Sequence, residues 1–476
     1  MSNVKDVQDG QDQKEQKEQR EQKGNPGLYR FVWRWHFYAG LVFAPMLIML
    51  SITGAIYLFK PYLEPMMDKE LHFVKAGDSE IAPSLQLKAV KDLYPEASIS
   101  NFTDRPERDR ATEIKVSKDG VGYTVFVDPY TGKVLGELQN DKRLMEIIVL
   151  LHGEVMAGEI GDNIVELSAS WAIILLITGL YLYWPRNKAS FLSLFRVRIR
   201  QGKRLFWRDL HASTGFWMTV FILFLILTGL PWASSFGERL NTVVEAAKLS
   251  NAPANLWSGG GAESVQLAKD VAETSWAAEN IHLPESVYAN SGMLPIENIA
   301  QFAANANIQP GYTVAMPKDE KGIYLITLSG WAANSVNEYA VVAVDQYSGK
   351  SLMDYRWKDY STFDKMIETG IALHEGRQFG WPNMLLNLIV CLSLILIVVS
   401  GITMWWKRRQ KGTFGVPKKF EGYRLSIGVI IITIGLGLLM PLVGYTMLAA
   451  LAIDLLIKLV NRARKSENTI DKGEAS

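Results

Sequence analysis

The sequence contains one cysteine, Cys391, among its 476 residues. A single cysteine cannot form an intramolecular disulfide, and it cannot supply the four thiolates of an iron–sulfur cluster or a cysteine-rich zinc site. An excess of charge of one sign is also absent, because the formal net charge is only +1. The composition therefore gives no reason to expect a nucleic-acid partner.

The N-terminal segment has very few apolar residues. Residues 1–24 consist mainly of Gln, Glu, Lys and Asp, a composition that cannot bury enough surface to fold, so they are expected to form a disordered tail. The segment also lacks the ordered basic region, short apolar core and cleavage site of a secretory signal peptide. The first apolar run is therefore expected to act as an uncleaved anchor.

Apolar residues are concentrated in five long runs, each long enough at about 1.5 Å per residue to approach the ~30 Å hydrocarbon layer of a membrane. The runs are Leu41–Phe59, Ala169–Trp184, Phe216–Trp232, Met384–Trp406 and Ser426–Val460. The last run is about twice the roughly 20 residues that one helix needs, and Met440-Pro441 and Gly444 lie in its middle. It predicts a helical hairpin, which gives six membrane spans in total.

Lys and Arg residues near the span ends predict the orientation, because they are retained on the cytoplasmic side. They are concentrated in residues 185–208 and 407–424, so both loops and both termini are expected to be cytoplasmic. The predicted spans occupy residues 34–59, 144–184, 209–232, 370–406 and, as a hairpin, 425–460, where 144–184 and 370–406 each begin with an interfacial segment. Residues 60–143 and the much longer 233–369 are expected outside, and 461–476 form a cytoplasmic tail.

The membrane segments contain an internal repeat. His36 and His211 each have a glycine four residues later, Gly40 and Gly215, and a Thr-Gly pair that begins 17 residues after the histidine. His152 and His374 form a second matching pair. At equal spacings, His152 is followed by Gly158 and then by Thr178-Gly179, and His374 is followed by Gly380 and then by Ser400-Gly401. The small-residue pairs, which include Thr53-Gly54 and Thr228-Gly229, are interpreted as sites of close helix packing.

The external segments repeat as well. Val127–Lys133 and Val344–Lys350 share the pattern Val-Asp-x3-Gly-Lys, which is typical of a hairpin turn. Helical patterns precede them at Leu85–Tyr94 and Ile296–Ala304, and strand patterns at Tyr123–Val127 and Tyr339–Val344. Each half of the chain is therefore predicted to be a helix, an external α+β domain and a second helix.

Four of the six histidines lie at membrane segments in matching repeat positions, whereas His72 and His282 have no counterparts. An ionisable residue at membrane depth is costly and indicates function. The orientation places His36 and His211 near the cytoplasmic side, and His152 and His374 near the external side. Two facing imidazoles are the axial ligands of a low-spin b-type haem, so the pattern predicts two haems.

The histidines have two other interpretations, and four neighbouring residues are candidates for a haem site. The histidines could be hydrogen-bonded packing residues, and zinc is a weaker rival because two imidazoles do not complete its usual set of ligands. Gly40 and Gly215 would leave room for a flat macrocycle beside the first pair. Arg34 and Arg208 could bind haem propionates, or they could be ordinary anchors on the cytoplasmic side.

The motifs over roughly residues 30–410 resemble those of the PepSY-associated transmembrane proteins, often called iron-regulated membrane proteins. The resemblance implies a four-helix haem-binding core and external PepSY domains. It also implies that His36 pairs with His211 and His152 with His374. Because the family includes siderophore reductases of the bacterial inner membrane, it further implies reduction of a ferric siderophore on the periplasmic side, which releases ferrous iron.

The sequence thus predicts a multi-pass membrane oxidoreductase that carries electrons through two b-type haems to a ferric siderophore or another periplasmic acceptor. No dinucleotide fingerprint is present, so the electrons must come from a quinol or a separate donor. The alternative is a non-enzymatic, membrane-anchored PepSY module that binds or inhibits a periplasmic peptidase. A transporter is a third possibility, but no broken helices with charged residues at mid-depth support it.

Overall fold

The computed structural model describes residues 26–185, 192–250, 263–287, 292–409 and 427–450, together with a few single positions from 412 to 460. The predicted tails 1–24 and 461–476 lie outside the described residues. The chain divides into two compact units, each assembled from segments that are distant in the sequence. The helical unit comprises residues 1–51, 157–236 and 392–476, and the sheet unit comprises residues 52–156 and 237–391.

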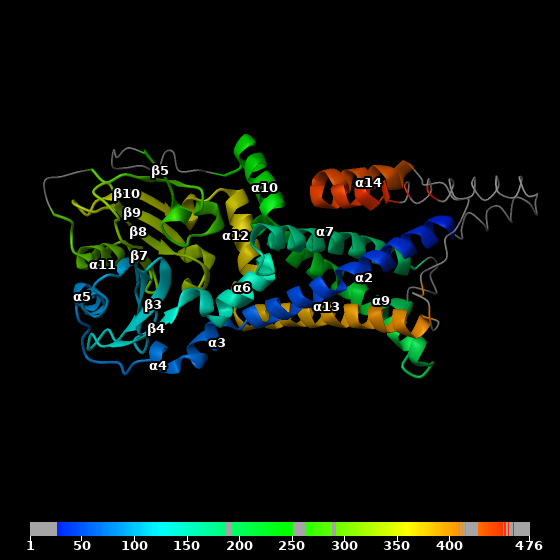
Figure 1. Ribbon diagram of the computed structural model, residues 1–476, viewed down its shortest axis with the longest axis horizontal. Helices are drawn as coiled ribbons and strands as arrows, with labels where there is room; N and C mark the ends of the chain where they lie inside the picture. The colour runs from blue at the N-terminus through cyan, green and yellow to red at the C-terminus, as the bar shows by residue number, and fades with distance from the viewer. Residues whose placement is uncertain are drawn as a thin grey trace, which may run out of the picture. The chain divides into compact units, whose positions relative to one another are not determined.

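Four helices in the described residues are long and apolar enough to cross a membrane. They are α2 (Pro26–Tyr57), α7 (Gly158–Tyr183), α9 (Lys203–Gly229) and α13 (Trp381–Arg408). An apolar solvent offers no hydrogen-bond partners to the backbone, whereas a helix forms these bonds within itself, so these runs fold as helices (Figure 1). At most 39% of the most apolar window of any of them is buried by protein, which leaves a large surface for lipid. Four predicted spans are therefore present.

The C-terminal run forms helix α14 (Ile427–Leu439) and a second apolar helix, Pro441–Ala450, which are separated at Met440. A Cβ atom on Gly444 would lie 2.7 Å from the carbonyl oxygen of Gly437, so the two helices approach too closely for a larger residue there. Their continuous described stretches are 13 and 10 residues long, shorter than the roughly 20 of a span. The structure therefore shows four candidate spans and does not confirm six.

The hairpin belongs to the helical unit and packs against its long helices. Met440 and Val443 are buried in one apolar cluster with Ala39 of α2 and Trp171 of α7. The indole Nε1 of Trp171 donates a hydrogen bond to Thr446 Oγ1, 3.1 Å away. These contacts fix the base of the hairpin on the side of α7 that carries Trp171.

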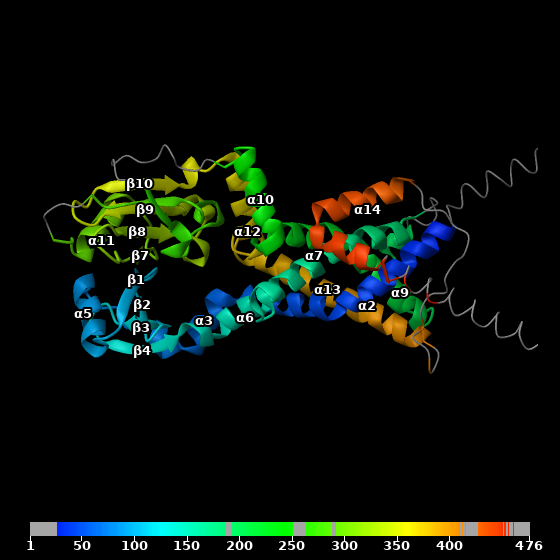
Figure 2. The ribbon, with the colours of Figure 1, turned by 45° about the horizontal axis from the view of Figure 1, so that its top comes forward.

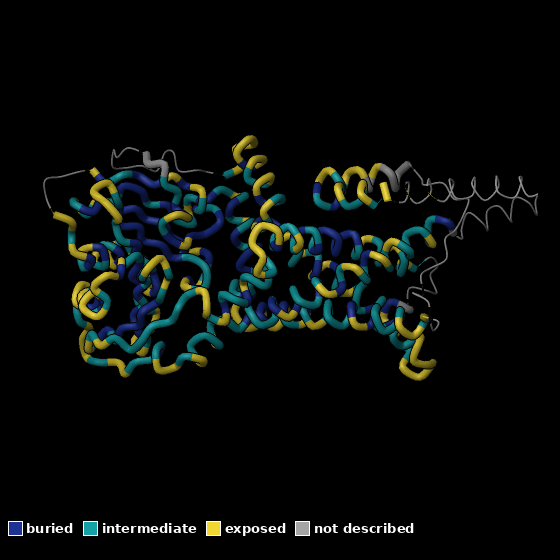
Figure 3. The backbone as a smooth tube through the Cα atoms, in the orientation of Figure 1, coloured by how far each residue is buried: buried dark blue, intermediate teal, exposed yellow. Residues whose placement is uncertain are grey.

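The sheet unit contains one eight-stranded antiparallel sheet, in the order β10-β9-β8-β7-β1-β2-β3-β4, as Figure 2 shows. The first half contributes β1 (Ser98–Thr103), β2 (Thr112–Lys118), β3 (Val121–Val127) and β4 (Val134–Gln139). The second half contributes β7 (Thr313–Ala315), β8 (Ile323–Leu328), β9 (Ala340–Asp345) and β10 (Ser351–Arg356). Strands β8 and β9 are buried along their whole length, dark blue in Figure 3.

The two external domains that we predicted are therefore joined in one sheet. Strands β1 and β7 pair antiparallel with Phe102 opposite Val314, and the hydroxyl groups of Thr103 and Thr313 lie 2.9 Å apart. Each strand would otherwise be the open edge of a four-stranded sheet, with unpaired backbone groups. Pairing β1 with β7 satisfies the backbone groups of both edges. The two repeated halves thus contribute equally to one continuous sheet.

Helices α5 (Pro83–Leu93) and α11 (Ile296–Asn305) occupy the positions where the sequence predicted helices. They meet where the backbone N–H of Ser84 donates to Glu297 Oε1 at 2.9 Å. The longer second half adds α10 (Ser234–Ala246) and a two-stranded sheet of β5 (Glu263–Leu267) and β6 (His282–Pro284). Leu283 of β6 is buried in the core of the second half.

Short helices connect the sheet to the long helices. They are α3 (Lys60–Met67), α4 (Lys69–His72), α6 (Leu144–Glu154) and α12 (Thr362–His374). Helix α6 ends just before α7, and α12 ends just before α13. Each of these two helices carries one of the repeated histidines in its last turn.

The repeated Asp motif forms the predicted hairpin turns. Asp128 accepts hydrogen bonds from the backbone N–H of Tyr130 and the hydroxyl group of Thr131, between β3 and β4. Asp345 accepts from the N–H groups of Tyr347 and Ser348, between β9 and β10. Gly132 and Gly349 have φ values of 73° and 69°, which favour glycine. The Asp-x3-Gly spacing is thus explained by the turn.

Asp345 has an additional bond that Asp128 lacks in the described structure: the N–H of Val287 donates to its Oδ2 at 2.8 Å. Burial raises the pKa of Asp345, but the hydrogen bonds from Ser348, Val287 and Tyr347 outweigh this effect and hold the pKa below its ordinary value. The stabilisation is therefore complete above the ordinary carboxyl pKa, and it is lost as the pH falls through the folded pKa.

We expect Asp345→Asn to lower the free energy of unfolding by about 2 kcal/mol, because an amide cannot accept every bond that the carboxylate accepts. Asp128→Asn is the matched control and should cost less than about 1 kcal/mol, since the hydroxyl group of Thr131 can rotate to suit the amide. Thermal unfolding of the purified full chain, followed by circular dichroism, compares the two variants. Equal losses of stability in the two variants would show that the additional hydrogen bond of Asp345 does not stabilise the fold.

Candidate functional site: two histidine pairs

The first pair lies within the helical unit. His36 on α2 and His211 on α9 have ring centroids 6.3 Å apart and ring planes at 87°. The Nδ1 of His211 lies 2.8 Å from the carbonyl oxygen of Ile397, which can only accept, so this nitrogen carries the proton. The Nδ1 of His36 lies 2.9 Å from Thr178 Oγ1, whose own proton is donated to Ile174 O. Both rings are therefore oriented through Nδ1.

The second pair lies within the sheet unit and has nearly the same geometry. His152 in the last turn of α6 and His374 at the end of α12 have ring centroids 6.4 Å apart and ring planes at 80°. The Nδ1 of His152 is hydrogen-bonded to Thr53 Oγ1 at 2.9 Å. His152 and His374, which are 222 residues apart in the sequence, thus occupy equivalent places in the repeat. The structure brings together the two pairs that the sequence predicted.

The small-residue pairs have a more specific role than the helix packing that we inferred from sequence. Thr178, Ser400 and Thr53 each have a side-chain oxygen within hydrogen-bonding distance of a histidine Nδ1. The glycine that follows each one lies against the same ring. A Cβ at Gly179, Gly401 or Gly54 would be 3.3 Å from the Cε1 of His36, His211 or His152, respectively. The hydroxyl group orients the ring, and the glycine leaves space for it.

The ring spacing fits a metal held between each pair. An imidazole nitrogen binds a metal at about 2 Å and its ring centre lies roughly 1 Å further, so two imidazoles on opposite sides of one metal have centres about 6 Å apart. Among the described residues, which include all six histidines, no group of three or more His, Cys, Asp or Glu could hold a metal ion. Zinc would therefore lack ligands, whereas haem iron needs only two from the protein.

A comparison with family models matches residues 33–408 to the PepSY-associated TM region. The chain belongs to this family. The match includes all four histidines of the two pairs and nearly all of the four long apolar helices. A comparison with curated proteins found no match. This PepSY-associated protein is therefore a membrane protein, and the lipid bilayer surrounds its apolar helices.

The glycines near the histidines differ in their surroundings in this PepSY-associated protein. A Cβ on Gly215 would meet no atom within 4 Å, and one on Gly40 would only reach Leu175 Cδ2 at 3.8 Å. Space for a flat group beside the first pair is therefore compatible with the structure. Gly158 and Gly380 have φ values of 56° and 60° where α7 and α13 begin, so their conformation favours glycine.

The two arginines predicted near the first pair have other partners. Arg208 binds Asp209 Oδ1 through Nη2 at 2.7 Å, and Arg198 binds the same carboxylate through Nε and Nη2. Arg34 lies over the ring of Tyr38, with its guanidinium carbon 5.9 Å from the ring centroid. Asp209 is buried and pairs with both Arg198 and Arg208, a role that was not predicted from the sequence. A contact of Arg34 or Arg208 with propionates stays a prediction.

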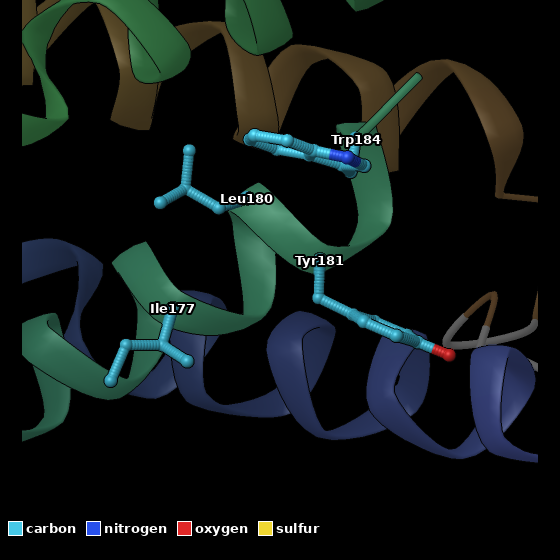
Figure 4. Close-up of a pocket in the computed structure, with 4 residues that line it drawn as sticks. All are labelled: Ile177, Leu180, Tyr181 and Trp184. Atoms are coloured by element: carbon cyan, nitrogen blue, oxygen red, sulfur yellow. The ribbon is translucent and has the colours of Figure 1, made fainter. Parts of the chain in front are cut away.

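Helix α7 also borders an apolar hollow of about 410 Å³, lined by Ile177, Leu180, Tyr181 and Trp184. Figure 4 shows the four side chains on the last turns of this helix. The hollow contains none of the histidines, and its apolar lining suits the hydrocarbon chains of lipid. We assign it no part in the site.

Under the haem interpretation, Thr178→Val should weaken haem binding by the first pair about tenfold, because a ligand histidine loses basicity and orientation when the partner of its other nitrogen is removed. The measurement is a titration of the haem-depleted protein with haemin, followed by absorbance. Thr219→Val is the matched control, since Thr219 lies in α9 and donates only to Gly215 O in the described structure. Equal losses in both variants would show that the Thr178 bond does not matter.

Proposed function

We propose that this membrane protein binds two b-type haems, one between His36 and His211 and one between His152 and His374. The observation that supports the proposal most directly is the repeated ring spacing of 6.3 and 6.4 Å. One such spacing could arise from packing alone. Two equivalent pairs, each held with the spacing that two axial ligands need, favour a pair of similar cofactors.

The residues of this chain orient the ligands. Thr178 and the carbonyl group of Ile397 accept the Nδ1 protons of His36 and His211, which selects the tautomer whose Nε2 can bind iron. Haem bound at these positions would supply one-electron redox chemistry. The apolar helices exclude water from the first pair, and the polar contacts of each ring keep it in place before a cofactor binds.

We further propose that the protein is an oxidoreductase of the bacterial inner membrane, with both termini in the cytoplasm. A quinol or a separate donor would supply electrons on the cytoplasmic side, near the His36/His211 pair. The acceptor would be a ferric siderophore on the periplasmic side, near the His152/His374 pair. Addition of one electron converts its Fe(III) to Fe(II), which a siderophore holds more weakly, so iron is released.

The proposal predicts that His374→Ala removes one of two haems. A pyridine haemochrome assay should give two b-type haems per wild-type chain and one per variant chain, and the reduced-minus-oxidised spectrum should lose one component. Dithionite-reduced wild-type protein should be reoxidised by a ferric siderophore, with Fe(II) captured by a ferrous chelator. The variant should lose this reaction, because the ligand lies at the external end of the route.

His282→Ala is the control, since His282 is exposed in the sheet unit and belongs to neither pair. It should retain both haems and the reaction. Wild-type protein that contains no haem after expression with adequate haem supply would overturn the proposal. That outcome would favour the membrane-anchored PepSY module that binds or inhibits a periplasmic peptidase.

A further inference from the structure

Two asparagines in α13 hold the end of the helix that carries His374. Asn387 Nδ2 donates to the carbonyl oxygens of Leu373 at 2.7 Å and of His374 itself at 2.9 Å. Asn383 Nδ2 donates to Leu373 O at 3.0 Å. The two asparagines are one helical turn apart and therefore lie on the same face of α13. Only 6% of Asn383 and 5% of Asn387 is exposed.

These bonds complete the C-terminus of α12. The last four carbonyl groups of a helix have no partners within it. The backbone of the following segment satisfies three of them, since Glu375 N donates to Ile371 O, Arg377 N to Ala372 O and Gly376 N to Leu373 O. The asparagine amides satisfy the carbonyl of His374 and reinforce that of Leu373. The peptide group of the histidine is thereby fixed to α13.

The first half of the repeat ends its helix differently. The residues at the positions equivalent to Asn383 and Asn387 are Gly161 and Val165. Helix α6 instead ends with Val155 and Met156 in the left-handed region, at φ values of 51° and 54°. The amide contacts are thus specific to the second half. A buried amide in an apolar helix is unfavourable unless it is hydrogen-bonded, so two of them at one helix end indicate a purpose other than packing.

We infer that Asn387, assisted by Asn383, is a positioning residue that sets the orientation of His374 toward His152. This inference depends on the proposed function, because orientation matters only if the pair binds a haem. Asn387 donates its hydrogen bonds to main-chain carbonyl groups of α12. It acts through the main chain, by preventing the last turn of α12 from unwinding.

The test uses Asn387→Leu, which is similar in size but has no hydrogen-bond donor. Electron paramagnetic resonance of the oxidised full-length protein should show that one of two low-spin haems is lost in favour of a high-spin form. Redox titration should show a shifted midpoint potential for that haem only. The haem at His36/His211 serves as the internal standard, and its unchanged signal shows that the variant has folded.

Three further variants make the test specific. Asn383→Leu should have a smaller effect, because Asn387 still holds both carbonyl groups. Asn387→Gln keeps both N–H donors and should partly restore the low-spin signal. Val165→Leu, at the equivalent repeat position, should leave both haems unchanged. An effect of Val165→Leu as large as that of Asn387→Leu would overturn the inference.

Hydrogen exchange of the haem-depleted protein separates positioning from a structural role. Asn387→Leu should speed exchange at the amides of Arg377 and Gln378, which donate to Ala372 O. Faster exchange with an unchanged spectrum would mean that Asn387 stabilises the helix end without positioning the ligand. Haem-free wild-type protein would overturn the proposed function together with this inference, whereas two unchanged haems in Asn387→Leu would overturn the inference alone.

Discussion

A histidine among apolar helices has two ring nitrogens, and the one that does not bind a ligand still needs a hydrogen-bond partner. The rest of the site follows from this requirement. A hydroxyl or carbonyl group on a neighbouring helix must lie beside the ring, and the backbone there must leave space for it. Thr178-Gly179 meets both conditions for His36, and Thr53-Gly54 meets them for His152. The small-residue pairs beside His36, His152 and His211 are therefore part of the site.

Because of the internal repeat, the same arrangement of histidines occurs twice. Because the two halves share the same spacing, each pair combines one histidine from each half, with ring distances that differ by only 0.1 Å, from 6.3 to 6.4 Å. The external segments obey the same relation. Strands β1 and β7 are equivalent in the repeat, and each pairs with the other at the centre of the sheet. Both units are thus built from equivalent pieces of the two halves.

The sequence was sufficient for the features that depend on local pattern. Apolar runs predicted the four long helices, β-branched and aromatic residues predicted β3 and β9, and the spacing of Asp345 and Gly349 predicted a turn. The pairing of His36 with His211 could be inferred because the repeat and the positive-inside rule place both near the same side. The Thr-Gly signal was visible too, but hydrogen bonding to histidine could not be distinguished from helix packing by spacing alone.

Features that depend on contacts between distant segments could not be predicted. Joining the two external domains requires an edge strand of one half to meet an edge strand of the other, and no local pattern encodes that meeting. The positions of Asn383 and Asn387 were equally uninformative, since an asparagine in an apolar run indicates only that some partner exists. The two asparagines lie in α13, whereas their partner is the main chain of α12. The hairpin was inferred from its length, but length does not show how far each helix extends.

The halves differ mainly where helices end and where loops connect strands. Strands β2 and β3 are joined by Asp119-Gly120, whereas residues 329–339 join the equivalent β8 and β9. The helix end after His374 is held by amides, and the one after His152 by left-handed residues. Duplication preserves the ring spacing that both histidine pairs require. It leaves the surroundings free to diverge, so two chemically similar sites can acquire different properties. In the proposed di-haem function, a difference in reduction potential between the two sites would give electron flow its direction.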